Sequence, residues 1–300
     1  MKVVVAIGGN ALLKRGEVLS AENQRANMRQ AASALAAIAK AHQLILVHGN
    51  GPQVGLLALE ADAYKGAPPY PFDVLGAESQ GMVGYIVEQE LRRALPAHEF
   101  AMLLTQTRVD ADDPAFTAPS KPIGPVYGEA AARALARERG WSIAPDGKGY
   151  RRIVASPIPV EIVEIAAIRK LVDAGVTVIC AGGGGVPVAR SADGGLSGVE
   201  AVIDKDLAAQ VLAVALGAER LVILTDVDGV YLDWDKPERR LLREAKAGDL
   251  IKGNFAKGSM GPKVSAACAF ALSTGHPAAI GNLADAARVM NGEAGTRIVA

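Results

Sequence analysis

A short apolar strand that runs into two glycines at the start of the chain places the strongest limit on its fold. Val3 to Ile7 are five apolar residues without a polar break, and Gly8 and Gly9 follow at once. Such a run predicts a strand buried on both faces, as found inside parallel sheets. A Gly-Gly turn exposes consecutive backbone N–H groups, which attract anions when a helix begins behind them. The stretch predicts either a central strand that ends at a phosphate-sized site or a plain turn.

The same pattern returns twice along the chain. Ser20 and the apolar spacing from Met28 to Ala39 predict a helix, and Leu44–Val47 then predicts a second strand. Strand, helix and strand form a βαβ unit with parallel strands, and ligand sites in such sheets lie beyond the carboxyl ends of the strands. The glycine turn after the first strand ends in Asn10. The second strand is followed by His48-Gly49-Asn50-Gly51, and a third predicted strand at 176–180 is followed by Gly182 to Gly185.

Composition excludes several classes of protein. Lys plus Arg and Asp plus Glu both number 32 in 300 residues, which argues against a nucleic-acid groove. No apolar run approaches the ~20 residues of a membrane span, and no signal peptide is visible, so we expect a cytoplasmic protein. Cys180 and Cys268 lack metal-site spacing and predict reduced core thiols.

The stretch from about 110 to 159 breaks the alternation of strands and helices. It is rich in proline, with a short helix predicted at 129–139. Lys121 stands among these prolines, which would hold its charge on a stiff segment. The stretch predicts an insertion beside the main sheet, acting as a lid or forming a surface loop.

Two lysines fall at predicted helix starts, where the helix dipole disfavours a cation. Lys205 precedes a helix that begins near Leu207, and Asp204 and Asp206 bracket it and are expected to hold it. Lys263 falls in the first turn of a helix that follows Gly258-Ser259-Met260-Gly261. This flexible approach predicts a loop that a ligand orders or a plain helix start with Ser259 as N-cap, and the two are compatible. A polyphosphate bound nearby would justify both lysines.

The remaining C-terminal signals are weaker. A strand at 221–224 runs into Asp226-Val227-Asp228-Gly229, whose carboxylates predict Mg²⁺ ligands or simple turn formers. Ala278–Gly281 predicts a last short strand. Neither the Rossmann fingerprint in its required context nor a P-loop is present, which disfavours a nicotinamide enzyme. The glycine turns and the lysines at helix starts favour phosphoryl transfer, which requires charge neutralisation and alignment. Because no catalytic base is evident, we expect an acceptor that is already an anion.

These motifs together resemble the amino acid kinase superfamily and, within it, the carbamate kinase family, over essentially the whole length. The segment around Lys121 is the most specific, because other superfamily members lack that insertion. Many relatives carry a lysine where this chain has Ala6, so the first turn supplies no cation of its own. The matching segments are Gly8–Ala11, His48–Gly55, Asp113–Phe116, Lys121–Pro125, Arg151–Pro157, Gly182–Gly185, Ile203–Ala208 and Gly258–Lys263.

The resemblance implies a three-layer αβα sandwich around a mainly parallel eight-stranded sheet, with a small protruding insertion subdomain at about 110–159. It implies one unit over 1–300, with an acceptor-binding half at 1–190 and a nucleotide-binding half at 191–300. The implied reaction is ATP plus carbamate giving ADP plus carbamoyl phosphate, with Mg²⁺. In this family it commonly runs toward ATP at the end of arginine fermentation, in a homodimer.

Site roles follow from the resemblance by position. Lys205, Lys263, Asp206 and Lys121 would be catalytic. Lys205 and Lys263 would stabilise the charge of the transferring phosphoryl group, Asp206 would orient them, and Lys121 would reach in from the insertion. The phosphoryl group and acceptor would be bound by Gly8, Gly9, Asn10, Gly49, Asn50 and Gly51, and the nucleotide by Asp226, Tyr231, Gly258 and Met260. Alternatives are another superfamily kinase with a different acceptor, or a nucleotide-binding regulator without turnover.

Overall fold

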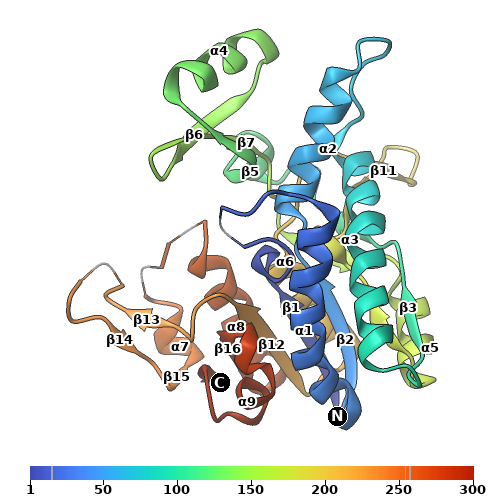
Figure 1. Ribbon diagram of the computed structural model, residues 1–300, viewed down its shortest axis with the longest axis vertical. Coiled ribbons are helices and arrows are strands. Elements are labelled where there is room, and N and C mark those ends of the chain that lie inside the picture. Colours follow the sequence, from blue (N-terminus) through green and yellow to red (C-terminus); the bar gives the residue numbers. More distant parts are fainter. Residues whose placement is uncertain (15, 235, 254, 257) are drawn as a thin grey trace.

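The computed structural model describes residues 1–14, 16–234, 236–253, 255–256 and 258–300, and the side chain of Asn10 falls outside that description. Its centre is a sheet in which six neighbouring strands are parallel and two edge strands run the other way (Figure 1). In spatial order the strands of this sheet are β15 (Glu244–Lys246), β17 (Thr296–Val299), β16 (Ala278–Asn282), β12 (Arg220–Thr225), β1 (Lys2–Ile7), β2 (Gln43–His48), β9 (Thr177–Ile179) and β3 (Phe100–Met102).

The strand β1 lies in the middle of the sheet and is buried on both faces. Val3, Val5 and Ile7 pack into one apolar cluster, and Val4 and Ala6 pack into another. Successive side chains of a strand point to opposite faces, so an unbroken apolar run is what a strand covered on both sides requires. The predicted central strand is confirmed.

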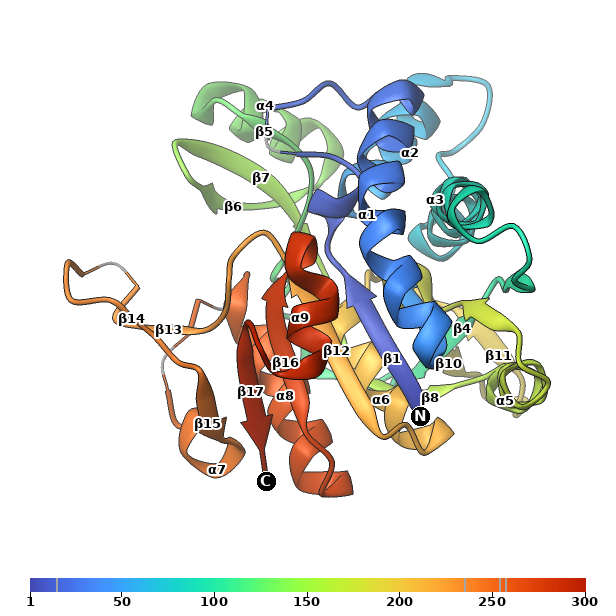
Figure 2. The same cartoon turned by 60° about the horizontal axis from the view of Figure 1, so that its bottom comes forward.

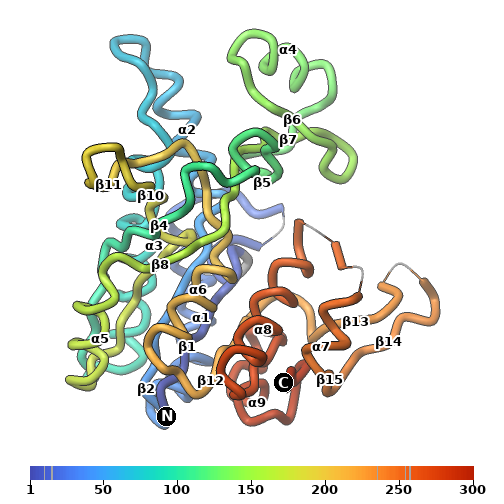
Figure 3. The backbone as a smooth tube through the Cα atoms, turned by 180° about the vertical axis from the view of Figure 1, so that it is seen from behind, coloured from blue at the N-terminus to red at the C-terminus, as the bar shows by residue number. Residues whose placement is uncertain are grey.

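Helices cover both faces of the sheet, which gives three layers. On one face lie α1 (Ala21–Ala41), α3 (Phe72–Ala94) and α9 (Ala286–Asn291) (Figure 2). The opposite face is covered by α5 (Ile165–Asp173), α6 (Lys205–Leu216), α7 (Ala247–Leu250) and α8 (Met260–Thr274) (Figure 3). The predicted three-layer sandwich with a mainly parallel sheet is therefore confirmed. Within the described residues, no helix has the length and apolar character needed to cross a membrane.

Smaller sheets extend this frame. The insertion forms a three-stranded antiparallel sheet with one helix and protrudes from the body (Figure 1). Its elements are β5 (Lys121–Tyr127), α4 (Glu129–Arg139), β6 (Ser142–Asp146) and β7 (Gly149–Val154). A four-stranded sheet and a ribbon complete the strands: β11 (Leu196–Gly198), β10 (Val186–Arg190), β4 (Gln106–Val109) and β8 (Pro159–Ile162), then β13 (Tyr231–Leu232) and β14 (Arg240–Leu241).

Several element boundaries differ from the sequence-based expectations. The helix α2 (Gly51–Ala63) was not predicted, because most of its side chains are only half-buried and show no apolar stripe. The strand at 278–281 is not the last, because β17 follows it and pairs antiparallel with it. Ser259 stands at the N-cap of α8, but its side chain makes no capping hydrogen bond.

Candidate active site

Two lysines from different helices meet on one carboxylate. The Nζ atom of Lys205, at the start of α6, lies 2.5 Å from Oδ1 of Asp206, and Nζ of Lys263 on α8 lies 3.0 Å from Oδ2. The Asp206 side chain is 2% exposed, and those of Lys205 and Lys263 are 11% and 15% exposed. A single buried carboxylate thus balances two cations, which leaves the group with a net positive charge.

The first two glycine turns lie beside this lysine pair. A methyl group placed on Gly49 would stand 3.1 Å from the backbone nitrogen of Gly9 and 3.4 Å from Cδ of Lys205. The two turns are adjacent because β1 and β2 pair in parallel, with Ile7 opposite His48, so their carboxyl ends fall together. Backbone N–H groups and a lysine stem therefore converge at one edge of the sheet.

The third glycine turn, at 182–185, packs against the side chains of the second turn, at 48–51. Gly183 has a φ of +65°, which favours glycine, and a methyl group there would overlap the side chain of Asn50. Gly182 leaves similar room for the ring of His48. Asn50 in turn donates from Nδ2 to the hydroxyl of Ser79 at 2.7 Å. The run at 182–185 therefore supports the second glycine turn through His48 and Asn50.

Lys121 reaches the same region from the insertion. Its Nζ lies 2.6 Å from Oδ2 of Asp204, while Oδ1 of Asp204 accepts the backbone N–H of Asp206 at 2.9 Å and caps α6. The insertion is fixed nearby, because a methyl group on Gly55 of α2 would stand 2.3 Å from the Cα atom of Gly124. The expectation that Asp204 and Asp206 both hold Lys205 is therefore only half right, since Asp204 binds Lys121.

The four residues expected at the nucleotide lie in the C-terminal part of the chain. Asp226 follows β12, and its charge contributes to the raised pKa of Lys263. Gly258 precedes α8, and Met260 is its first residue and packs against the core. The hydroxyl of Tyr231 donates to the carboxylate of Asp228 at 2.8 Å. Among the described residues, no group of three or more His, Cys, Asp or Glu side chains is arranged to hold a metal ion.

The buried charges shift the pKa values of their neighbours. Burial lowers the pKa of Lys205, and the charge of Lys263 adds to this, although Asp206 opposes it. Burial acts on Lys263 in the same direction, but the attraction of Asp206 outweighs it, so the pKa of Lys263 lies above its ordinary value. For Asp204, burial favours the neutral acid, but the ammonium of Lys121 outweighs it and holds the pKa well below the ordinary range.

His48 is buried beside the second turn and stays neutral. Burial lowers its pKa to about 4, and the charge of Lys205 acts in the same direction. Its Nδ1 lies 3.1 Å from the carbonyl oxygen of Gly49, which fits an Nδ1–H donor. His48 therefore holds the backbone of the turn as a neutral group.

Relatives of known identity resemble the chain over its full length. A model of the amino acid kinase family matches residues 1–282. The carbamate kinase of Haemophilus influenzae is 52% identical over 299 residues, which make up 99% of this chain and 96% of that protein. The chain belongs to the carbamate kinase family. The carbamate kinase of Pyrococcus furiosus is 46% identical, over 99% of each chain. A solved structure of carbamate kinase from Giardia lamblia bound to AMP-PNP has a TM-score of 0.90 and 43% identity, covering 99% of this chain and 98% of that one.

Membership of the carbamate kinase family gives the predicted residues a common setting. Lys205, Lys263 and Asp206 are in contact, and Gly9 and Gly49 lie beside Lys205. Lys121 binds Asp204, which in turn accepts the backbone N–H of Asp206. Gly8 and Gly51 flank the two turns, and the side chain of Asn10 lies outside the described residues. The site also contains His48, for which the sequence analysis predicted no role, and Asp204, which was expected to hold Lys205 and instead binds Lys121. Their positions within the matching motifs were the available signal.

Proposed function

We propose that this protein catalyses reversible phosphoryl transfer between ATP and carbamate, giving ADP and carbamoyl phosphate. As a member of the carbamate kinase family it is a phosphotransferase, and its relatives are kinases over the whole length of the chain. The observation that carries the proposal is the pair of buried lysines on Asp206, beside two glycine turns. In phosphoryl transfer, the main demands are alignment and neutralisation of the charge on the transferring group.

In the proposed mechanism, each lysine has a donor left for the phosphoryl oxygens. An ammonium has three N–H donors, and Asp206 accepts from one of those on Lys205 and one on Lys263. In the ATP-forming direction, a terminal oxygen of ADP forms a bond to phosphorus as the bond from phosphorus to the carbamoyl oxygen breaks. Carbamate leaves as an anion, so no general base is needed. The N–H groups of Gly8 and Gly49 already donate to the carbonyl oxygens of Leu224 and Ile7. Those of Gly9 and Gly51, in the same two turns, would therefore bind the phosphoryl oxygens.

The two halves of the chain divide the substrates in this proposal. Residues 1–190, with the insertion at 110–159, would hold carbamate or carbamoyl phosphate, with Asn10 and Asn50 near the acceptor and Lys121 above it. Residues 191–300 would hold ATP or ADP through Asp226, Tyr231, Gly258 and Met260. The solved Giardia lamblia relative is bound to AMP-PNP, a nucleotide analogue, which supports a nucleotide site in this fold.

Mg²⁺ would enter this site with the nucleotide. Asp206 and Asp204 already accept from lysines, whereas the side chain of Asp226 accepts from the hydroxyl of Thr225 at 3.1 Å. Mg²⁺ prefers phosphate oxygens and waters with one or two carboxylates, so Asp226 is the residue that we propose beside it. When bound, the ion would neutralise phosphate charge. A homodimer, a cytoplasmic location and a role in arginine breakdown stay predictions from the resemblance.

The experiment that tests this function measures ATP formation by the purified protein from ADP and a set of acyl phosphates, with Mg²⁺. We expect carbamoyl phosphate to be used with a kcat/KM well above that of acetyl phosphate, because the insertion with Lys121 closes over the acceptor side. Preference for another acyl phosphate would favour a different kinase of the superfamily. Nucleotide binding without turnover of any acyl phosphate would favour the regulatory alternative.

A further inference from the structure

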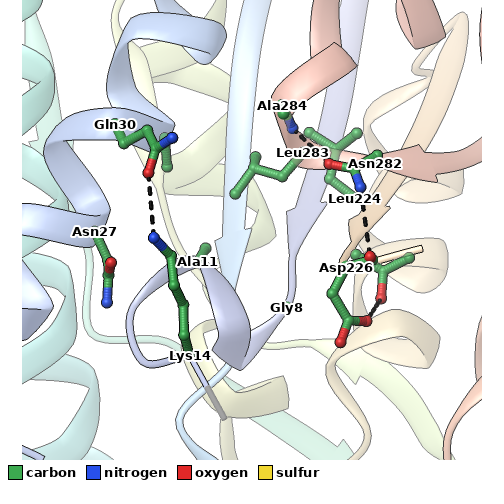
Figure 4. Close-up of a pocket in the computed structure, with 12 residues that line it drawn as sticks. Gly8, Ala11, Lys14, Asn27, Gln30, Leu224, Asp226, Asn282, Leu283 and Ala284 are labelled. Carbon is green, nitrogen blue, oxygen red and sulfur yellow. Dashed lines mark hydrogen bonds between the residues drawn. The ribbon is translucent and has the colours of Figure 1, made fainter. Parts of the chain in front are cut away.

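A cavity adjoins the first glycine turn at Gly8. It has a volume of about 380 Å³, and its walls come from both halves of the chain. Lys14 and Gln30 form one wall, Asp226 and Asn282 form the opposite wall, and Gly8 lies between them (Figure 4). The volume falls at the small end of the ~300–1,000 Å³ typical of ligand pockets. Neither Lys205 nor Lys263 lines it.

The cavity combines apolar walls with one charge of each sign. Ala11, Ala31, Leu224 and Leu283 supply apolar surface. In the part of the chain that the structure describes, Lys14 has no carboxylate within ion-pair distance and its Nζ lies 3.4 Å from Oε1 of Gln30. The carboxylate closest in sequence, Glu17, is engaged elsewhere: it accepts the backbone N–H of Lys14 at 2.9 Å and the amide of Asn27 at 2.6 Å.

The opposite wall presents a carboxylate and an amide. Asp226 has no ion-pair partner among the described residues, and its backbone carbonyl accepts from Nδ2 of Asn282 at 3.4 Å. Lys14 and Asp226 stand on opposite sides of Gly8 in Figure 4. A dianion would be repelled by Asp226, and a simple cation by Lys14. Lys14 and Asp226 are both exposed, so water solvates them in the empty cavity, and an apolar molecule would displace that water without replacing its hydrogen bonds.

We propose that this cavity binds a small zwitterion of the free amino acid type, with its carboxylate toward Lys14 and its ammonium toward Asp226. Its apolar body would cover Leu224 and Leu283. The cavity shares Gly8 and Asp226 with the proposed phosphoryl-transfer and nucleotide sites, whereas Lys14, Gln30 and Asn282 line the cavity alone.

The position of the cavity implies a link to nucleotide binding. Asp226 is also the carboxylate that we propose beside the nucleotide, so zwitterion and nucleotide would draw on one side chain. Each ligand is therefore expected to weaken the other by a limited factor, and by the same factor in both directions. If the two ligands bind at two sites, the Kd of one rises only to a plateau as the other is added. If they compete for one site, that Kd keeps rising in proportion to the concentration of the competitor.

The first test is a thermal-shift screen of the full chain against the twenty free L-amino acids, each at high concentration. A ligand that binds only the folded state raises the unfolding midpoint. The best ligand is then measured by calorimetry, together with two analogues that lack either the ammonium or the carboxylate. We expect at least one amino acid to bind and both analogues to bind at least tenfold more weakly, the scale of a hydrogen bond to a charged group. No shift with any amino acid, or equal binding of an analogue, would overturn the proposal.

The second test uses Lys14→Met, with Lys40→Met as its control. Lys40 is an exposed lysine in the last turn of α1, away from the cavity. We expect Lys14→Met to weaken the amino acid about tenfold and Lys40→Met to leave its affinity unchanged. Adding AMP-PNP should raise the Kd of the amino acid to a plateau. Equal effects of the two variants, or a Kd that rises in proportion to AMP-PNP, would overturn the proposal, while ATP formation by the unmodified enzyme tests the proposed function separately.

Discussion

Replacing Asp206 with asparagine should remove the charge that keeps two buried lysines in place. The variant has nearly the same shape, but Lys205 and Lys263 lose the carboxylate that both contact and keep only the weaker attraction of more distant carboxylates such as Asp204. Removing one partner of a buried ion pair typically costs about 3–5 kcal/mol of unfolding free energy. The loss of unfolding free energy has an upper limit, because a buried lysine can lose its proton instead of staying charged. At pH 7 this costs about 1.4 kcal/mol for each of the roughly 3.5 pH units below its ordinary pKa, or about 5 kcal/mol.

The pH dependence makes this prediction specific. In the variant the folded-state pKa of a lysine lies below its unfolded value, so the unfolded chain binds more protons and stability rises with pH. We therefore expect Asp206→Asn to lose about 3–5 kcal/mol at pH 7 relative to the wild type. Between pH 7 and 9.5 it should regain about 1.4 kcal/mol per pH unit for each lysine that becomes neutral.

Equilibrium unfolding in urea, which adds no ions, measures both effects. The control is Asp173→Asn, which removes the partner of Lys2 from an ion pair of 2.8 Å whose aspartate is 53% exposed. Exposed pairs contribute about 0–1 kcal/mol, so the control should change little at either pH. A loss below about 1 kcal/mol for Asp206→Asn, or a loss that does not shrink as pH rises, would refute the charge balance described above.

Three further predictions concern the edges of the site. Lys121→Ala should raise the KM for carbamoyl phosphate more than the KM for ADP in steady-state assays, and an equal loss for both would remove Lys121 from the acceptor side. Asp204→Asn keeps an oxygen for the α6 cap but breaks the 2.6 Å ion pair with Lys121, so it should share the KM effect. Asp204→Ala should in addition lose about 1 kcal/mol of stability in urea unfolding, the typical contribution of an N-cap. If Asp204→Asn leaves the KM for carbamoyl phosphate unchanged, the ion pair does not position the lysine. Finally, the pKa of His48 is lowered to about 4, so the wild type should lose stability as pH falls from about 6.5 to 4, by up to roughly 3 kcal/mol. His48→Gln should flatten that part of the urea-measured stability curve, and an unchanged slope would assign the acid sensitivity elsewhere.

The parts of the fold that the sequence predicted are those with a local signal. The buried strand at 3–7 and the helix capped by Ser20 follow from apolar spacing and a cap, and both are present. The helix α2 escaped prediction because its half-buried residues carry no apolar stripe. The strands of the insertion sheet and β17 were not predicted, because each is stabilised by pairing with another strand rather than by a local apolar pattern.

The site shows the same division. Lys205 and Lys263 stood out because a cation at a helix start conflicts with the helix dipole. That conflict predicted an unusual environment, while the orientation of both lysines by Asp206 was implied only by the resemblance to the family. The partner of Lys121 was beyond prediction from spacing, because Asp204 lies 83 residues away and meets it only when the insertion folds back over α6. Contacts of this kind depend on the packing of the whole chain.

The central claim is that the two lysines on Asp206 stabilise the phosphoryl group during transfer. The most direct measurement is kcat for ATP formation from ADP and carbamoyl phosphate, at saturating substrates and Mg²⁺, for Lys205→Met and Lys263→Met beside the wild type and Lys40→Met. We predict that each site variant loses roughly 10²-fold or more in kcat, the scale of a lost transition-state donor, and that Lys40→Met retains full activity. Turnover near the wild-type value in both site variants would contradict the claim.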